Sequence, residues 1–311
     1  MRDHIAPFVY YLEVHLLYAS ILFLAAWALT SIRGASATWK YWIWVATSIN
    51  FMLPLGGFFN GFGASRVSWA TQLGGLDDVG IGISRNLTAG ALILGVWSCG
   101  AAFMFARLLL RLHWDRRDER RSAGSTAPLK RRFLAHGVPV TLSAAGQGPS
   151  VDGVLRPHIS LPLGIDRLLN DRELDAVLIH EVTHARRRDN LIGLLHEIAL
   201  CGLWFHPLVW LTGSRLAMFR ELSCDDYVIA SSRGGDLVTA LAKLADPGES
   251  RLLRAGAATP FRHRLARLKA SPPHRARGAA DLVLIMIYVC VLLACVVETI
   301  AHTPSCFRVV V

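Results

Sequence analysis

The sequence predicts a mainly α-helical, polytopic membrane protein with four transmembrane helices and an α+β domain between the third and the fourth. Two observations predict this class. Of the 311 residues, 53% are hydrophobic and only 18% are charged, and the mean hydropathy is +0.38, a composition unusual for a soluble globular protein. In addition, four apolar runs are long enough to cross a hydrocarbon core of about 30 Å. They cover residues 8–32, 41–60, 87–110 and 281–301.

These spans divide the chain into three regions. Residues 1–111 form a three-helix transmembrane region, and residues 112–278 form a domain long enough to have its own core. Residues 279–311 contain the fourth span and a short tail outside the membrane. A further apolar stretch, 191–213, is interrupted by polar residues and by Pro207, so we expect a buried or interface-lying helical pair there.

Basic residues indicate how the spans are oriented. Cytoplasmic loops retain Lys and Arg, and here these residues gather after the third span and before the fourth. The two clusters are Arg107, Arg111, Arg116, Arg117, Arg120, Arg121, Lys130, Arg131 and Arg132, and Arg262, Arg264, Arg267, Lys269, Arg275 and Arg277. We therefore expect the 112–278 domain in the cytoplasm and both termini outside. Orientation in a lipid bilayer also accounts for the net charge of +10, and no motif for direct nucleic-acid binding accompanies it.

The 112–278 domain contains the pattern H-E-x-x-H, at His180, Glu181 and His184. On a helix the two histidines lie about 40° apart, so both imidazoles can reach one metal ion, with Glu181 beside them as a general base. Acidic residues at 171 and 173 and basic residues at 186–188 predict that the motif lies on a helix. The alternative is a pair of ordinary helix-face histidines that bind no metal.

A catalytic zinc ion needs a third protein ligand. The extended pattern H-E-x-x-H-x-x-G-x-x-H is excluded, because Arg187 and Asn190 stand where its glycine and last histidine would be. A glutamate from a later helix is another common ligand, and Glu221 and Asp225 form E-x-x-x-D in a helical stretch. Taken alone, this second pattern leaves the third ligand open.

Two short runs, Val138–Leu142 and His158–Leu161, have the composition of β-strands. The strand around Ile159 is a candidate for substrate binding, because an edge strand near a peptidase site can hold an extended peptide by backbone pairing. The alternative is that this strand lies in the core.

Three sequence blocks occur in order between the third and fourth spans: HEVTHARRRDN at 180–190, WFHPLVW at 204–210 and RELSCDDYV at 220–228. Together with GVLRPHISLP at 153–162, they resemble the BlaR/MecR family of integral-membrane zinc peptidases. The resemblance implies a gluzincin-like α+β zinc-peptidase domain in a bacterial-type cytoplasmic membrane.

The resemblance also implies roles for individual residues. One Zn²⁺ per chain would be bound by His180, His184 and Glu221, with Glu181 as the general base. Asp225 would accept a hydrogen bond from a ligand imidazole and fix its tautomer.

By the same resemblance we expect a zinc endopeptidase that cleaves a cytoplasmic regulator, such as a transcriptional repressor, or its own basic linkers. Members of this family are known as antibiotic receptors with an extracellular penicillin-binding sensor domain after the last span. Here about ten residues follow the fourth span, and they contain no S-x-x-K module. We therefore expect an input from a sensor partner protein, from the loop at 61–85, or no input.

Two other functions remain open from the sequence. The first is a quality-control zinc peptidase that cleaves misfolded membrane proteins. The second, from a different class, is a membrane signalling scaffold whose metal site is structural rather than catalytic.

Overall fold

The computed structural model describes seven parts of the chain. They are residues 2–32, 35–52, 87–122, 137–143, 148–244, 264–268 and 278–301. The predicted input loop at 61–85 and residues 53–60 of the second predicted span lie outside these ranges.

A helix occupies the described part of each predicted span. These helices are α1 (Arg2–Ser31), α2 (Ala37–Met52), α5 (Leu87–Ser122) and α13 (Gly278–Ala301). Within the described residues, one segment, Ala91–Arg117 of α5, is long and apolar enough to cross a membrane, and only 6% of its most apolar window is buried. Two shorter apolar helices, His15–Ser31 and Asp281–Cys295, lie in α1 and α13. The four crossings and their orientation stay predictions.

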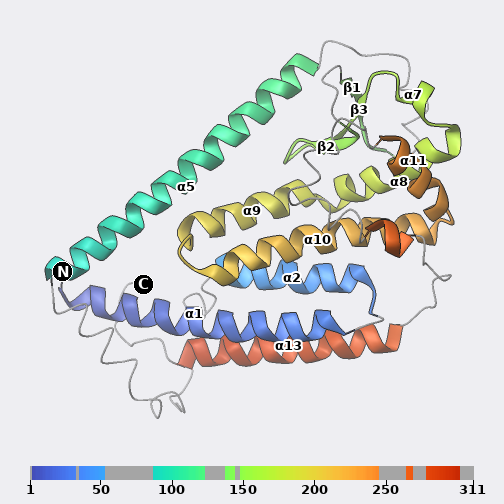
Figure 1. Cartoon of the computed structure of the whole chain (residues 1–311). Coiled ribbons are helices and arrows are strands. Elements are labelled where there is room, and N and C mark those ends of the chain that lie inside the picture. The colour runs from blue at the N-terminus through green and yellow to red at the C-terminus, as the bar shows by residue number, and fades with distance from the viewer. Residues whose placement is uncertain are drawn as a thin grey trace.

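Most helices lie roughly side by side in a stack (Figure 1). α13 runs along α1, and α2 packs between α1 and α10 (Pro207–Ala230). α10 is preceded by α9 (Asp189–Gly202), and the two helices form a hairpin that turns just before Pro207. Proline is favoured in the first turn of a helix, because its missing N–H would have no partner there. The helical pair predicted at 191–213 is thus present, with α10 extending well beyond it.

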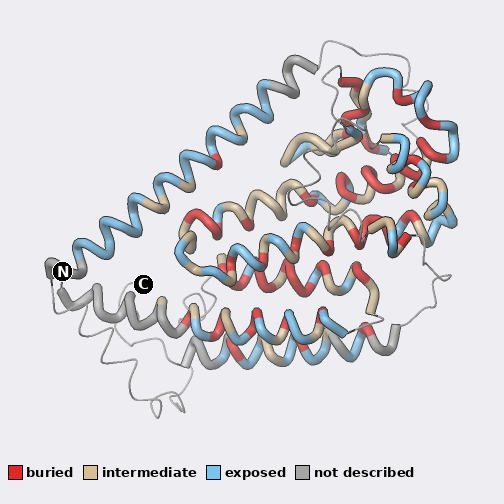
Figure 2. The backbone as a smooth tube through the Cα atoms, in the orientation of Figure 1, coloured by how far each residue is buried: buried red, intermediate tan, exposed pale blue. Residues whose placement is uncertain are grey.

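Helix α5 diverges from this stack (Figure 1), and most of its residues are exposed (Figure 2). Polar contacts connect it to α9. Trp97 Nε1 donates to the Gly202 carbonyl at 2.9 Å, and Arg111 pairs with Glu197 at 2.9 Å. An apolar helix with so little protein around it is suited to contact with lipid.

The predicted strands form part of a small three-stranded sheet. It contains β1 (Val140–Ser143), β2 (Ser150–Asp152) and β3 (His158–Pro162) in the order β1-β3-β2. β3 pairs in parallel with β1 and antiparallel with β2. The sheet packs on α8 (Asp171–Arg187), next to the short helix α7 (Ile165–Leu168) and to α11 (Gly234–Leu244).

The premise that the strand around Ile159 is an edge strand is wrong, and the core alternative holds. Ile159 lies in the central strand, where it pairs with Val140 on one side and Val151 on the other, and its side chain is fully buried in the core. A strand with a neighbour on both sides has no free backbone edge to offer a peptide. The edge strand of this sheet that lies near α8 is β2 instead.

Candidate metal centre

Helix α8, which carries the H-E-x-x-H pattern, has a well-defined beginning. Asn170 caps it, accepting hydrogen bonds at its side-chain oxygen from the backbone N–H groups of Arg172 and Glu173 at 3.0 Å. The Glu173 carboxylate in turn accepts from the Asn170 N–H at 2.9 Å, which completes a capping box. Lys243 of α11 also binds this carboxylate, at 2.7 Å. The cap fixes where the helix starts and therefore which face it turns to the core.

Helix α8 ends at a sharp turn that places Asp189 against His184. Arg188 adopts a left-handed conformation, with φ 57° and ψ 46°, and it is both the C-cap of α8 and the N-cap of α9. The chain reverses there without a glycine, although such a conformation costs a residue with a Cβ atom roughly 1 kcal/mol or more. The turn brings Asp189, the first residue of α9, back beneath His184.

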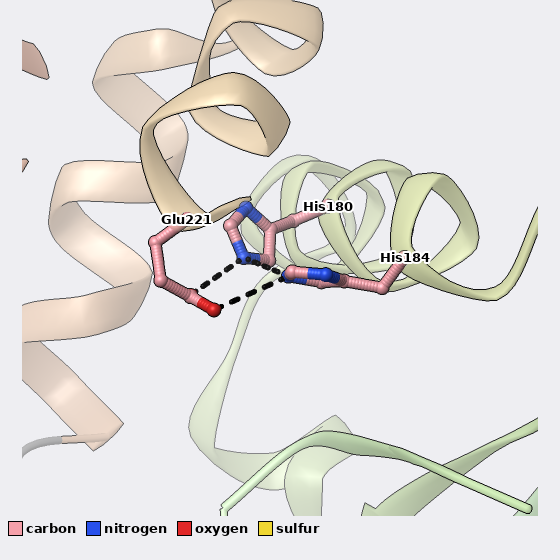
Figure 3. Close-up of side chains that lie close together, drawn as sticks. All are labelled: His180, His184 and Glu221. Atoms are coloured by element: carbon pink, nitrogen blue, oxygen red, sulfur yellow. Dashed lines mark hydrogen bonds and ion pairs between the residues drawn. The ribbon is translucent and has the colours of Figure 1, made fainter. Parts of the chain in front are cut away.

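Three side chains from α8 and α10 converge on one point (Figure 3). His180 and His184 lie one turn apart on α8, with their Nε2 atoms 3.1 Å from each other. Glu221 reaches in from α10, with one carboxylate oxygen 3.6 Å from His180 Nε2 and the other 3.7 Å from His184 Nε2. The structure therefore brings together the three residues predicted as ligands.

The spacing of these atoms fits a zinc ion. Ligand atoms about 2.1 Å from a tetrahedral ion lie about 3.4 Å from one another. The three observed separations are 3.1, 3.6 and 3.7 Å, on either side of that value. Two imidazoles and a carboxylate are also a common ligand set of catalytic zinc, which leaves a fourth position for water or substrate.

The Glu221 carboxylate is suited electrostatically to bind a cation. Its burial raises its pKa, but the nearby His180, His184 and Arg264 outweigh this effect and hold the pKa well below its usual range. Glu221 is consequently an anion at neutral pH. Arg220 Nε also donates to it, at 3.2 Å.

Asp189 holds the second histidine. One of its carboxylate oxygens accepts a hydrogen bond from His184 Nδ1 at 2.6 Å, which leaves Nε2 of the same ring directed at Glu221 and His180. Arg187 donates to both oxygens, from Nε at 2.7 Å and from Nη2 at 2.6 Å. Burial raises the pKa of the Asp189 carboxyl, but the bonds from His184 and Arg187 outweigh it and lower the pKa to about 2. A carboxylate in this place fixes the tautomer of a metal-binding imidazole.

Asp225 lies behind the first histidine, with Oδ1 3.2 Å from His180 Nδ1. It is almost completely buried, and it also accepts two hydrogen bonds from Arg264, from Nε at 3.0 Å and from Nη2 at 2.8 Å. Arg264 Nη1 lies 3.1 Å from a Glu221 oxygen. One guanidinium therefore links the third candidate ligand to the carboxylate behind the first.

The converging side chains border a cavity of about 310 Å³. His180, Glu181, His184 and Glu221 line it, together with Arg264. Residues 149–151, at and just before strand β2, also line it. Glu181 thus shares a cavity with the three candidate ligands without being one of the three that converge.

A second group, His184, Asp189 and Cys224, also places possible ligand atoms within 4.8 Å of one another. Arg187 occupies this position, because its Nη2 donates to Asp189 Oδ2 and lies 3.2 Å from Cys224 Sγ. Burial also raises the pKa of the Cys224 thiol, which disfavours the thiolate that a metal needs. A guanidinium in the centre of the group is not compatible with a cation there.

Two residues of the site escaped the sequence analysis. Asp189 directly follows the three arginines that end α8, and an acidic residue at that helix boundary was the available signal. Arg264 had no such signal, since it belongs to a basic cluster that membrane orientation already explained. Asp225 lies close to His180, as its predicted role requires, but that role stays a prediction.

Comparison with known proteins identifies a related family. Residues 83–235 match the model of the family described as BlaR1 peptidase M56. The regulatory protein BlaR1 of Bacillus licheniformis is 37% identical over 83 residues, which is 27% of this chain and 14% of that protein. The methicillin resistance mecR1 proteins of Staphylococcus aureus and Staphylococcus epidermidis are each 24% identical over 100 residues, which is 32% of this chain and 17% of those proteins.

The matched segment spans less than a fifth of these relatives' length, namely 14% of BlaR1 and 17% of the mecR1 proteins. The family match, however, runs from the beginning of α5 to the beginning of α11 and includes both helices that carry the converging residues. The segment that contains both helices therefore matches the BlaR/MecR-type peptidase family.

Proposed function

We propose that the chain is a membrane-anchored zinc endopeptidase that cleaves a cytoplasmic regulator, such as a transcriptional repressor, or itself, in a signalling pathway. The observation that carries the proposal is the convergence of His180, His184 and Glu221 at zinc-like spacings in the cavity that also contains Glu181. A buried site with a ligand set of this kind and a further carboxylate in the same cavity, that of Glu181, is suited to peptide hydrolysis.

Each side chain has a distinct task in this proposal. The two histidines and Glu221 hold zinc, which when bound supplies Lewis-acid chemistry by acidifying water and polarising the scissile carbonyl. Glu181 accepts the proton of the attacking water and returns it to the leaving amine. Proton transfer by a positioned group contributes about 10²- to 10⁴-fold to the rate. Asp189 and Asp225 keep the two imidazoles oriented.

Strand β2 is the element best placed to hold the substrate. Among the described residues it pairs with β3 on one side only, and its residues Ser150 and Val151 line the cavity with Glu181 and the candidate ligands. Asn190 Nδ2 donates to the Val151 carbonyl at 2.8 Å and to the Gly153 carbonyl at 3.2 Å, which steadies this edge. An extended peptide added alongside β2 would present its backbone to the cavity.

The location proposed is a bacterial-type cytoplasmic membrane, with the peptidase domain in the cytoplasm and both termini outside. The basic residues that flank the third and fourth predicted spans support this orientation. The named relatives are described as a regulatory protein and as methicillin resistance proteins, which supports a regulatory role and a protein substrate. The proposed stimulus comes from a partner protein or from the loop at 61–85.

Substitution of the proposed base separates catalysis from a structural role of the metal. Glu181→Gln should keep zinc but slow cleavage of a co-expressed repressor at least about 100-fold, because only the proton acceptor is lost. His180→Ala should lose both zinc and cleavage. Glu197→Gln is the matched control, since Glu197 lies on α9 and pairs with Arg111 outside the cavity.

The same experiment judges the alternatives. If Glu181→Gln behaves like wild type while His180→Ala fails, the chain is a scaffold with a structural metal and not a peptidase. Cleavage of misfolded membrane proteins with an intact repressor would instead favour the quality-control function.

A further inference from the structure

Tyr41, on the first turns of α2, connects a predicted membrane helix to the metal centre. Its side chain is fully buried, and its hydroxyl donates to Asp189 Oδ1 at 2.7 Å. Asp189 Oδ2 in turn accepts from His184 Nδ1 at 2.6 Å. Only two hydrogen bonds therefore separate α2 from a candidate zinc ligand. Both are short bonds to a carboxylate, the class that is roughly twice as strong as bonds between neutral groups.

The contacts of Tyr41 fix the rotation of the Asp189 carboxylate. Each oxygen has two donors: Oδ1 receives Tyr41 and Arg187, and Oδ2 receives His184 and Arg187. The Arg187 guanidinium also lies over the Tyr41 ring, 4.0 Å from its centroid. Tyr41 thus holds the carboxylate directly, through its hydroxyl, and indirectly, through the arginine that its ring supports.

The same end of α2 also contacts the helix that provides the third candidate ligand. The backbone N–H of Ala37 donates to Asp226 Oδ2 at 2.9 Å, and Ser223 Oγ donates to Thr38 Oγ1 at 3.2 Å. Asp226 and Ser223 both lie on α10 shortly after Glu221: Ser223 is two residues beyond it, and Asp226 directly follows Asp225. The beginning of α2 therefore touches both halves of the centre, the α8–α9 turn and α10.

We propose that Tyr41 is a positioning residue for the metal centre, acting through Asp189 on the orientation of His184. The inference rests on the proposed zinc site but not on any substrate. It makes α2 a structural part of that site, so a movement of α2 in the membrane would alter how well His184 is held. Loss of a carboxylate that orients a metal-binding histidine reduces metal affinity about 10- to 100-fold, and Tyr41 acts one bond further out.

Tyr41→Phe tests this directly, because it removes the hydroxyl and keeps the ring over Arg187. In the full-length, detergent-purified chain we expect a zinc affinity about 3- to 10-fold weaker in competition with a chelator. The visible absorption spectrum of the Co²⁺-loaded protein should shift as well, because it reports ligand geometry even when the metal is saturating. Tyr227→Phe is the control, since Tyr227 lies on α10 with an exposed side chain.

A double-mutant cycle shows whether Tyr41 acts through Asp189. In an Asp189→Asn background, Tyr41→Phe should have little further effect on zinc affinity, whereas a purely structural effect would add to the first. Unchanged affinity and an unchanged Co²⁺ spectrum in Tyr41→Phe would overturn the inference and leave the proposed peptidase intact. A wild-type chain that binds zinc but cleaves neither a co-expressed repressor nor itself would remove the proposed function alone, and a wild type that binds no zinc would overturn both.

Discussion

Replacing Asp189 with asparagine should weaken the metal centre, because the Asp189 carboxylate holds the imidazole of His184. The substitution keeps the size of the side chain but removes the charge that accepts bonds from His184, Arg187 and Tyr41. The amide would also present N–H groups where only acceptors fit. We expect zinc to bind about 10- to 100-fold more weakly, equivalent to about 1.4–2.7 kcal/mol.

The same substitution should also destabilise the fold, for a reason that can be estimated from burial. The Arg187 side chain is only 9% exposed, and Asp189 is its counter-ion at 2.6 Å. Breaking a buried ion pair by removing one partner costs about 3–5 kcal/mol. Arg187 keeps bonds to Ser223 Oγ and to the Arg220 carbonyl, so we expect the lower end, about 3 kcal/mol.

Two assays on the purified chain measure these effects: zinc competition with a chelator, and loss of tertiary structure with increasing denaturant. Asp175→Asn is the matched control, because Asp175 pairs with Arg233 at 3.1 Å near the surface and its side chain is 40% exposed. An exposed pair contributes about 0–1 kcal/mol. The reasoning would be refuted by an Asp189→Asn chain that binds zinc as tightly as the Asp175→Asn control.

Three other substitutions test how the site is supported. Asn170→Ala removes the capping box of α8 and should lower stability by about 1 kcal/mol in denaturant unfolding; no change would show that the cap is dispensable. In Gly213→Ala the new Cβ would lie 2.4 Å from His196 Nε2, so we expect the free energy of unfolding to fall by about 1–3 kcal/mol. In the control, Gly193→Ala, the new Cβ meets no atom within 4 Å, and the change should be neutral or stabilising. Equal melting temperatures for the two variants would contradict the packing of α9 on α10. Arg264→Ala should tighten zinc binding, because the guanidinium lies 3.1 Å from a Glu221 oxygen and 3.4 Å from His180 Nε2 and so competes with a cation for both candidate ligands; unchanged affinity would make these contacts incidental.

Features that depend on a local sequence pattern, such as the helices and the spacing of the two histidines, could be predicted from the sequence. Apolar length identified the helices that became α1, α2, α5 and α13, and the four-residue spacing of His180 and His184 fixed their common face of α8. Glu221 was found because a third ligand was required and the resemblance supplied one. All three side chains converge as expected.

The remainder depended on contacts between distant segments. Strand order decides whether Ile159 is an edge or a core residue, and nothing in a five-residue strand reveals its neighbours. Asp189 lies close to the motif in sequence, but its role requires the left-handed turn at Arg188. Such a turn is not predicted at a residue other than glycine. Tyr41 is 148 residues from Asp189, and Arg264 is 39 residues from Asp225, so only tertiary packing brings them together.

The central claim, a zinc site built by α8 and α10, is tested most directly by the zinc content of the purified full-length chain. Wild type, His184→Ala and Glu221→Ala should be measured side by side. We expect about one zinc per chain in wild type and a large loss in both variants, because each removes one of three protein ligands. Wild type without zinc, or a Glu221→Ala chain that retains it in full, would contradict the account.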